Sequence, residues 1–234
     1  APACAAPAGP GTEQPGGTGA RDVGRAGIDR ADRGSRLTVA ATAEEPARDC
    51  PLCPRLKAFR DENWRNYPDY FNGPVPSFGP KDAPLLIVGL APGLHGANRT
   101  GRPFTGDYAG DLLYATLLKL GLAKGHYEKR IDDGLELVDC RIVNSVRCVP
   151  PQNKPLPVEI NTCNRFLKAS LDAHTHAKAF LALGAIAHDA ALKAFGEKKS
   201  AMKFGHGAQH RLKDGRVLTD SYHCSRYNTN TGVL

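Results

Sequence analysis

The chain has 234 residues, of which 41% are hydrophobic and 24% charged, which suits one α/β domain and is too short for two large ones. No stretch approaches the roughly 20 apolar residues that span a bilayer, and the start lacks a secretory pattern, so we expect a cytoplasmic protein. Residues 1–49 hold six Arg, no Lys and seven acidic residues and sum to −1, so residues 50–234, with 25 basic and 17 acidic residues, carry +8 of the chain's net +7. A basic folded region favours a phosphate-rich partner.

The first 49 residues differ in composition from the rest. Ala, Gly and Pro make up 25 of them, and Phe, Trp, Tyr and Met are absent. Such a segment buries too little apolar surface to offset the entropy lost on ordering. We predict a disordered tail over 1–49 and a folded domain over 50–234.

The folded region alternates between strand and helix patterns. The apolar run Leu-Leu-Ile-Val at 85–88 is bounded by Pro84 and Gly89 and predicts a buried parallel strand. Further strands are predicted around 137–146, 179–183 and 217–221, and helices over 108–120, 158–173 and 186–195. The alternation predicts an α/β fold with a parallel sheet covered on both faces. Ligands bind such sheets at the carboxyl ends of the strands, which here lead into the loops 89–107, 144–157 and 222–232.

The seven cysteines are an odd number, which argues against a fully paired set of disulfides. Cys50 and Cys53 form a C-x2-C pair in a Pro-flanked turn. Cys148 ends a predicted strand, and Cys163 lies early in the next helix. Four thiolates suffice for a [4Fe–4S] cluster or a structural zinc, and the plainer alternative is two unrelated pairs of buried thiols. Their spacing does not choose between iron and zinc.

The loop at 89–107 follows a strand directly, but it has neither a G-x-G-x-x-G pattern nor the Lys-Ser/Thr of a P-loop. Gly89 and Gly93 permit a close approach of the backbone to a ligand. Phe104 offers a flat face for a base. Asp107 places a carboxylate at a helix N-terminus, where it tends to stay ionised. Simple N-capping is the commoner role for such an Asp.

Two later loops carry polar side chains. Asn144 ends an apolar strand, and its amide can match the N3–H and O4 edge of uracil, although it can equally satisfy a turn. His223 follows another strand and can donate to an oxygen that becomes negative as a bond breaks, although a lone His is more often packed or exposed. With Ser225, Arg226 and Asn228 beside it, phosphate contact is expected.

The region 50–234 resembles the type-B, or family 5, uracil-DNA glycosylases in five motifs, which in this order are specific: CPLC at 50–53, VPSFGP at 75–80, GLAPGLHGANRTGRPFTGD at 89–107, VNSVRCVPPQNKP at 143–155 and HCSRYNTNTG at 223–232. The resemblance implies a three-layer fold with a central four-stranded parallel sheet flanked by helices. It also implies a [4Fe–4S] cluster that is bound by the four thiols of Cys50, Cys53, Cys148 and Cys163.

The resemblance further implies a mechanism. A uridine flips out of single- or double-stranded DNA, Phe104 stacks on the base, and Asn144 reads its edge. His223 stabilises charge on uracil O2, and Asp107 orients water, because Ala91 stands where many relatives hold an acidic or polar residue. Gly89, Ala91 and Gly93 are expected to line the base-binding site, and hypoxanthine, xanthine and ethenocytosine are further expected substrates.

The sequence departs from the family pattern at two points. Cys224 follows His223 where relatives usually have proline, which predicts a looser loop, and relatives continue beyond Leu234 into a final helix that is expected to be missing here. We expect a monomer. The rival interpretation is a non-catalytic iron–sulfur or zinc module that binds nucleic acid on the same sheet.

Overall fold

A mostly parallel five-stranded sheet forms the centre of the structure, a computed structural model that describes residues 44–232 and 234. Its strand order is β4 (Cys140–Asn144), β1 (Leu85–Gly89), β5 (Ala179–Leu183), β7 (Val217–Ser221) and β6 (Gln209–Arg211). The first four strands run parallel, as predicted, and β6 pairs antiparallel with β7 at one edge. The predicted strand at 137–146 divides in two, because Asp139 has a φ of 55° and separates β4 from β3 (Glu136–Leu137), which pairs with β2 (Ala123–Lys124).

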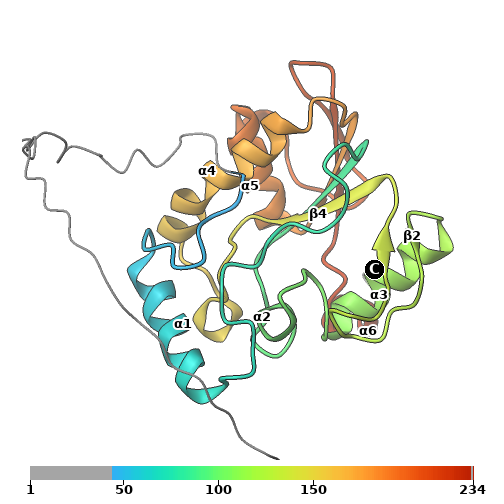
Figure 1. Ribbon diagram of the computed structural model, residues 1–234. Coiled ribbons are helices and arrows are strands. Elements are labelled where there is room, and N and C mark those ends of the chain that lie inside the picture. The colour runs from blue at the N-terminus through green and yellow to red at the C-terminus, as the bar shows by residue number, and fades with distance from the viewer. Residues whose placement is uncertain (1–43, 233) are drawn as a thin grey trace, which may run out of the picture. The chain divides into compact units, whose positions relative to one another are not determined.

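Helices cover both faces of this sheet (Figure 1): α1 (Pro54–Asn66), α2 (Ala97–Thr100), α3 (Tyr108–Lys119), α4 (Pro157–Ala173), α5 (Ala185–Phe195) and α6 (Arg226–Asn230). Short 3-10 turns lie at Pro151–Asn153 and Lys199–Ala201. α4 begins with a proline, and the carboxylate of Glu159 accepts a hydrogen bond from the backbone N–H of Leu156 at 2.7 Å. Among the described residues, no helix combines the length and apolar character needed to cross a bilayer.

The core lies in two layers because successive residues of β1 point to opposite faces. Leu86 and Val88 pack against α4 and α5, whereas Ile87 packs against α3 on the other face. All three side chains are fully buried, and each contributes about 1.5–3 kcal/mol through burial. This double covering holds the carboxyl ends of the strands in fixed relative positions.

The folded domain begins before the predicted boundary at residue 50. Glu45 contacts the guanidinium of the buried Arg147 at 2.7 Å and accepts a hydrogen bond from the backbone of Ser77 at 3.0 Å. The guanidinium of Arg48 lies 4.1 Å from the ring centroid of Phe71. Residues 44–49 therefore pack on the domain and do not belong to a tail. The rest of the predicted tail, 1–43, lies outside the described residues.

Candidate active site

A cavity of about 360 Å³ opens where three strand-end loops meet. Phe104 from the first loop, Asn144 from the second and His223 from the third all line it, as the parallel topology predicts. Four further predicted residues line the same cavity: Ala91, Gly93, Asp107 and Ser225. Predicted site residues that are separated by more than 100 positions in the chain therefore share one space.

Gly89 lies at the end of β1, where the first two loops come closest. It is the register partner of Asn144 on the neighbouring strand β4. A Cβ built on Gly89 would meet the side-chain oxygen of Asn144 and would lie 2.7 Å from Cε2 of Phe104. Only the missing side chain lets Phe104 and Asn144 approach the sheet together, so Gly89 shapes the cavity without lining it.

A buried ion pair holds the loop that carries Phe104. The guanidinium of Arg102 donates two hydrogen bonds to Asp133, at 2.8 and 2.7 Å, and both side chains are almost fully buried. Burial alone would raise the pKa of Asp133, but the Arg102 contacts and two backbone N–H donors hold that pKa well below its usual range. Tyr114 donates to the carbonyl of Pro103 at 2.6 Å. Phe104 itself has a φ of 53°, a conformation that the surrounding contacts must maintain.

Asn144 presents a polar atom that the protein leaves unpaired. Its side chain is 3% exposed, and within the described part of the chain its Oδ1 atom is buried without a hydrogen-bond partner. Leaving such a group unpaired is unfavourable by about 1–3 kcal/mol. Because Asn144 also lines the cavity, a ligand with a matching donor would remove this penalty.

Asp107 combines two roles at the start of α3. Its Oδ1 accepts a hydrogen bond from the backbone N–H of Gly110 at 3.0 Å, the N-cap contact that the sequence suggested as the plainer role. Its Oδ2 lies beside Gly93 and Gly96, where added Cβ atoms would lie 3.4 and 2.8 Å away. The carboxylate thus caps the helix with one oxygen and lies at the cavity wall with the other.

His223 lies next to Phe104 in the cavity lining, with ring centroids 5.8 Å apart and an interplanar angle of 30°. Burial lowers the pKa of His223 below 6.5, and the charge of Asp107 opposes this shift. The ring is therefore neutral at neutral pH and can serve as a hydrogen-bond donor. Asn228 donates to the carbonyl of His223 at 2.7 Å and so fixes the turn. Cys224, in place of the family's proline, is 5% exposed, and burial raises its pKa to about 12.

The predicted phosphate-binding residues lie on or before α6. Ser225 caps this helix through a 3.4 Å contact from the backbone N–H of Asn228. Arg226 is exposed, with its guanidinium 5.1 Å from the ring centroid of Tyr108. One N–H of the Asn228 amide is engaged with the carbonyl of His223, which leaves its second N–H and its oxygen for another contact. Arg226 is the predicted residue that faces solvent most freely.

The four predicted cysteines gather around a second, small cavity between α1 and α4, which also contains Leu52, Leu56 and Phe166. Arg60 donates from its guanidinium to the Sγ of Cys148 at 3.3 Å and to the carbonyl of Cys50 at 2.8 Å. All six cysteines of the described residues are free thiols. Burial and the neighbouring Cys163 raise the pKa of Cys53 to about 11. Four converging thiols with a buried cation beside them are a donor set that fits a thiolate-bound metal centre.

Comparison with known protein families identifies a superfamily that shares this part of the chain. The model of the Uracil DNA glycosylase superfamily matches residues 76–233, which include all three cavity loops. The chain belongs to this superfamily. The fold and the cavity at the carboxyl ends of the strands are therefore those of a DNA glycosylase family.

Individual relatives within the superfamily are also similar. A Type-5 uracil-DNA glycosylase of Thermus thermophilus is 47% identical over 191 residues, which cover 79% of this chain and 86% of that protein. A Type-5 enzyme of Mycobacterium bovis is 43% identical over 193 residues, with coverages of 79% and 72%. A Type-4 uracil-DNA glycosylase of Pyrobaculum aerophilum is 30% identical over 155 residues, with coverages of 66% and 65%.

Sequence reasoning missed two residues, one in the cavity lining and one on the helix that begins beside the cavity. Asn153 lines it from the Pro-rich loop, in a left-handed backbone conformation with a φ of 56°. Tyr227 follows Arg226 on α6, and 75% of its surface is exposed. The sequence signal for Tyr227 was its residue type alone, an aromatic ring directly after a predicted phosphate-binding Arg, because stacking on DNA bases requires such a ring. Asn153 carried no local signal, since its position depends on the fold.

Proposed function

We propose that this chain excises uracil from DNA by hydrolysing the bond between the base and its deoxyribose. The main support for this proposal is the Oδ1 atom of Asn144, which is buried at the cavity without a hydrogen-bond partner among the described residues. The N3–H of uracil is a donor that would satisfy this acceptor, and the Asn144 amide would donate to O4. Phe104 and His223 lie next to each other at the cavity, with ring centroids 5.8 Å apart, so a base that stacks on Phe104 would meet the His223 ring at its edge.

The chemistry divides between Asp107 and His223. The C1′–N1 bond breaks with its electron pair passing to uracil, which leaves a cationic sugar and negative charge spread to uracil O2. The neutral His223 ring donates a hydrogen bond to this oxygen, and the ionised Asp107 stabilises the sugar and orients the water that attacks C1′. The water's proton leaves as the sugar hydroxyl forms, and uracil N1 is finally protonated.

DNA would approach over the α6 side of the cavity. Arg226 and the capped N-terminus at Ser225 offer contacts to phosphates, and the exposed ring of Tyr227 can stack against bases beside the extruded nucleotide. Each phosphate that a basic side chain neutralises steepens the dependence of binding on salt. We therefore expect Arg226→Ala to weaken binding to all duplexes alike and to flatten that dependence.

We also propose a broader choice of bases, including hypoxanthine, xanthine and ethenocytosine. The cavity of about 360 Å³ exceeds what a single pyrimidine ring fills, and Ala91 contributes only a methyl group to its wall. A larger base that offers an N–H to Asn144 would meet the same acceptor. Single-turnover cleavage of duplexes that carry each base tests this list, and a strict limit to uracil would refute it.

We further propose that the four cysteines hold a [4Fe–4S] cluster. A tetrahedral zinc with bonds of about 2.3 Å requires sulfur atoms about 3.8 Å apart. Among the described residues, the one group with three ligand atoms within 4.8 Å of one another is His188, His210 and Asp220, so no three of these thiols are that close. The wider spacing supports a multi-iron cluster, which would be structural and tie α1 to the loop before α4.

The cluster proposal is tested by the metal content of the isolated protein. We expect iron and inorganic sulfide in equal amounts, and their loss in Cys148→Ser. Cys140→Ser is the matched control, because Cys140 is equally buried but lies apart from this cavity. Zinc in place of iron, or iron that Cys140→Ser removes as well, would contradict the proposal.

The excision proposal is tested with uracil-containing duplexes under single-turnover conditions, where strand breaks after alkali report the abasic product. Wild type should cleave, and Asn144→Ala should lose about 1–3 kcal/mol of transition-state stabilisation, or roughly 5- to 150-fold in rate. Asn66→Ala, an exposed asparagine at the end of α1, is the control and should keep the wild-type rate. No release of uracil by wild type would sink the proposed function.

A further inference from the structure

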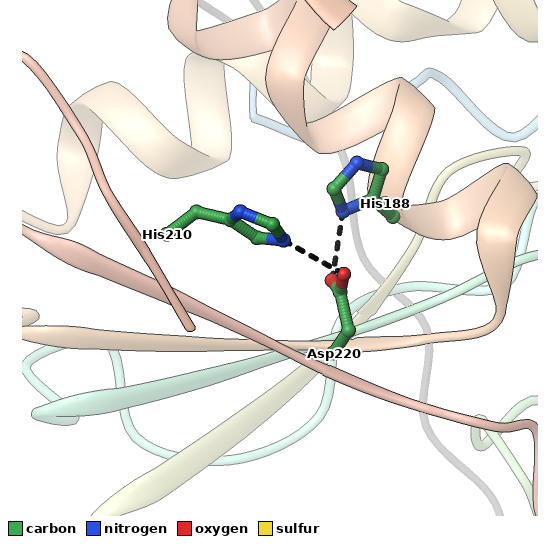
Figure 2. Close-up of side chains that lie close together, drawn as sticks. All are labelled: His188, His210 and Asp220. Carbon is green, nitrogen blue, oxygen red and sulfur yellow. Dashed lines mark hydrogen bonds and ion pairs between the residues drawn. The ribbon is translucent and has the colours of Figure 1, made fainter. Parts of the chain in front are cut away.

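Three polar side chains meet outside the cavity, where α5, β6 and β7 come together (Figure 2). His188 Nδ1 lies 2.7 Å from Oδ1 of Asp220, and His210 Nε2 lies 2.9 Å from Oδ2 of the same carboxylate. Their three ligand atoms all lie within 4.8 Å of one another. None of the three residues lines the candidate active site.

The charge balance of this cluster is unusual. The carboxylate of Asp220 is fully buried, and the salt bridges of the described residues give it no Lys or Arg partner, only the two imidazoles. The backbone N–H of Gly205 at 3.3 Å is its other hydrogen-bond donor. A buried carboxylate needs a positive charge beside it, because the ionised form is otherwise strongly disfavoured.

The hydrogen bonds of His188 show where that charge is needed. Its Nε2 lies 3.0 Å from the carbonyl of Met202, which can only accept, so Nε2 carries a hydrogen. In a neutral ring the lone pair of Nδ1 would then point at a carboxylate oxygen 2.7 Å away. This repulsive contact requires either a proton or a metal ion between the two atoms.

We propose that His188, His210 and Asp220 form a binding site for a divalent metal ion of the zinc class. Two imidazoles and one carboxylate are a ligand set that zinc takes with water as the fourth ligand. A carbonyl that accepts from the second ring nitrogen, as Met202 does here, is the usual partner of a metal-bound His. The side chain of His210 is 11% exposed, which gives water a route to the fourth position.

The site would fasten the edge of the sheet. Its ligands come from α5, from the short edge strand β6 and from β7, so a bound ion would join α5 to the three-residue ladder by which β6 pairs with β7. Asp220 also precedes His223 by three residues, and its backbone pairs with Gly207 and Ala208. The ion would therefore act on the stability of this edge and would take no part in bond cleavage.

Zinc binding to the intact chain, isolated with whatever iron it carries, tests the proposal. We expect one equivalent to bind by calorimetry and raise the melting temperature, and zinc-edge X-ray absorption to show nitrogen and oxygen neighbours at about 2.0–2.1 Å without sulfur. His210→Gln keeps a donor for Asp220 and should weaken binding more than about tenfold. His206→Gln, an exposed histidine four residues away whose ring accepts from Tyr222, should bind zinc as wild type does.

Three results would overturn the proposal. The first is the absence of saturable zinc binding by wild type, which needs no variant and so does not depend on whether His210→Gln folds. The second is a sulfur shell at about 2.3 Å, which would place the ion on the cysteines instead. The third is equal zinc affinity of folded His210→Gln and wild type, because the ion would then lie elsewhere.

Discussion

The pair Asp107→Asn and Asp107→Ala separates helix capping from catalysis at one position. Oδ1 caps α3 through Gly110, and Asn keeps an acceptor at this place, whereas Ala removes it. Asp107→Asn should therefore lose only the favourable contact of a charge with the helix dipole, about 0.3–1 kcal/mol. Asp107→Ala should lose the cap as well and be destabilised by about 1–2 kcal/mol. Urea unfolding followed by circular dichroism measures both values.

Catalysis should not follow this ranking. Both variants remove the carboxylate that we assign to the water and the sugar cation, so both should cleave uracil-containing DNA about 10²- to 10⁴-fold more slowly. This loss corresponds to about 2.7–5.5 kcal/mol of barrier, far more than the capping loss. The pKa of His223 should also fall further, because the Asp107 charge now raises it, and NMR titration of the ring would report this. Wild-type cleavage by Asp107→Asn would refute the reasoning and leave Asp107 as a cap alone.

Three further predictions concern residues that line or support the same cavity. Burial lowers the pKa of His223, so the unfolded chain binds the proton more tightly than the folded chain does, and wild type should lose stability as the pH falls below about 6.5. In His223→Gln the urea midpoint should depend less on pH in this range, and an unchanged pH dependence would contradict the prediction. Gly89→Ala would bring a methyl group within 2.7 Å of Phe104, so it should destabilise the fold by about 1–3 kcal/mol in urea unfolding and slow uracil excision. A wild-type free energy of unfolding together with a wild-type excision rate would contradict the proposed crowding. Asp133→Asn should be destabilised by about 3–5 kcal/mol, because it leaves the buried Arg102 charge uncompensated. The double variant Arg102→Met with Asp133→Leu should recover most of this loss, because it removes both charges. Equal stability of the two variants would show that the loss in Asp133→Asn does not come from the broken ion pair.

The central sheet could be predicted from the sequence because its strands are short apolar runs between clear breakers. The predicted bounds at 179–183 and 217–221 match β5 and β7. Convergence of Asn144 and His223 on one cavity then followed from topology, since parallel strands end at one edge. Local pattern could not reveal β6, whose sequence Gln-His-Arg is polar and which exists only by pairing with β7.

The missed helix α1 has a different cause. Its buried face includes Arg60 and Asn63, so its apolar periodicity is weak, and the guanidinium of Arg60 is accommodated only because Cys148 and the carbonyl of Cys50 lie beside it. The same holds for Arg102 and Asp133, which lie 31 positions apart in the chain. Partners that meet only after folding leave no trace in a window of neighbouring residues.

The buried ion pair between Arg102 and Asp133 affects how the protein would search DNA. Because these contacts are made within the protein itself, they would hold the backbone before Phe104, the proposed stacking residue, in place before a nucleotide arrives. A preformed binding site needs no loop rearrangement at each encounter with DNA. The rate at which the protein tests bases would then depend on how often base pairs open spontaneously. Weakly paired lesions, which open more readily, would then be sampled first.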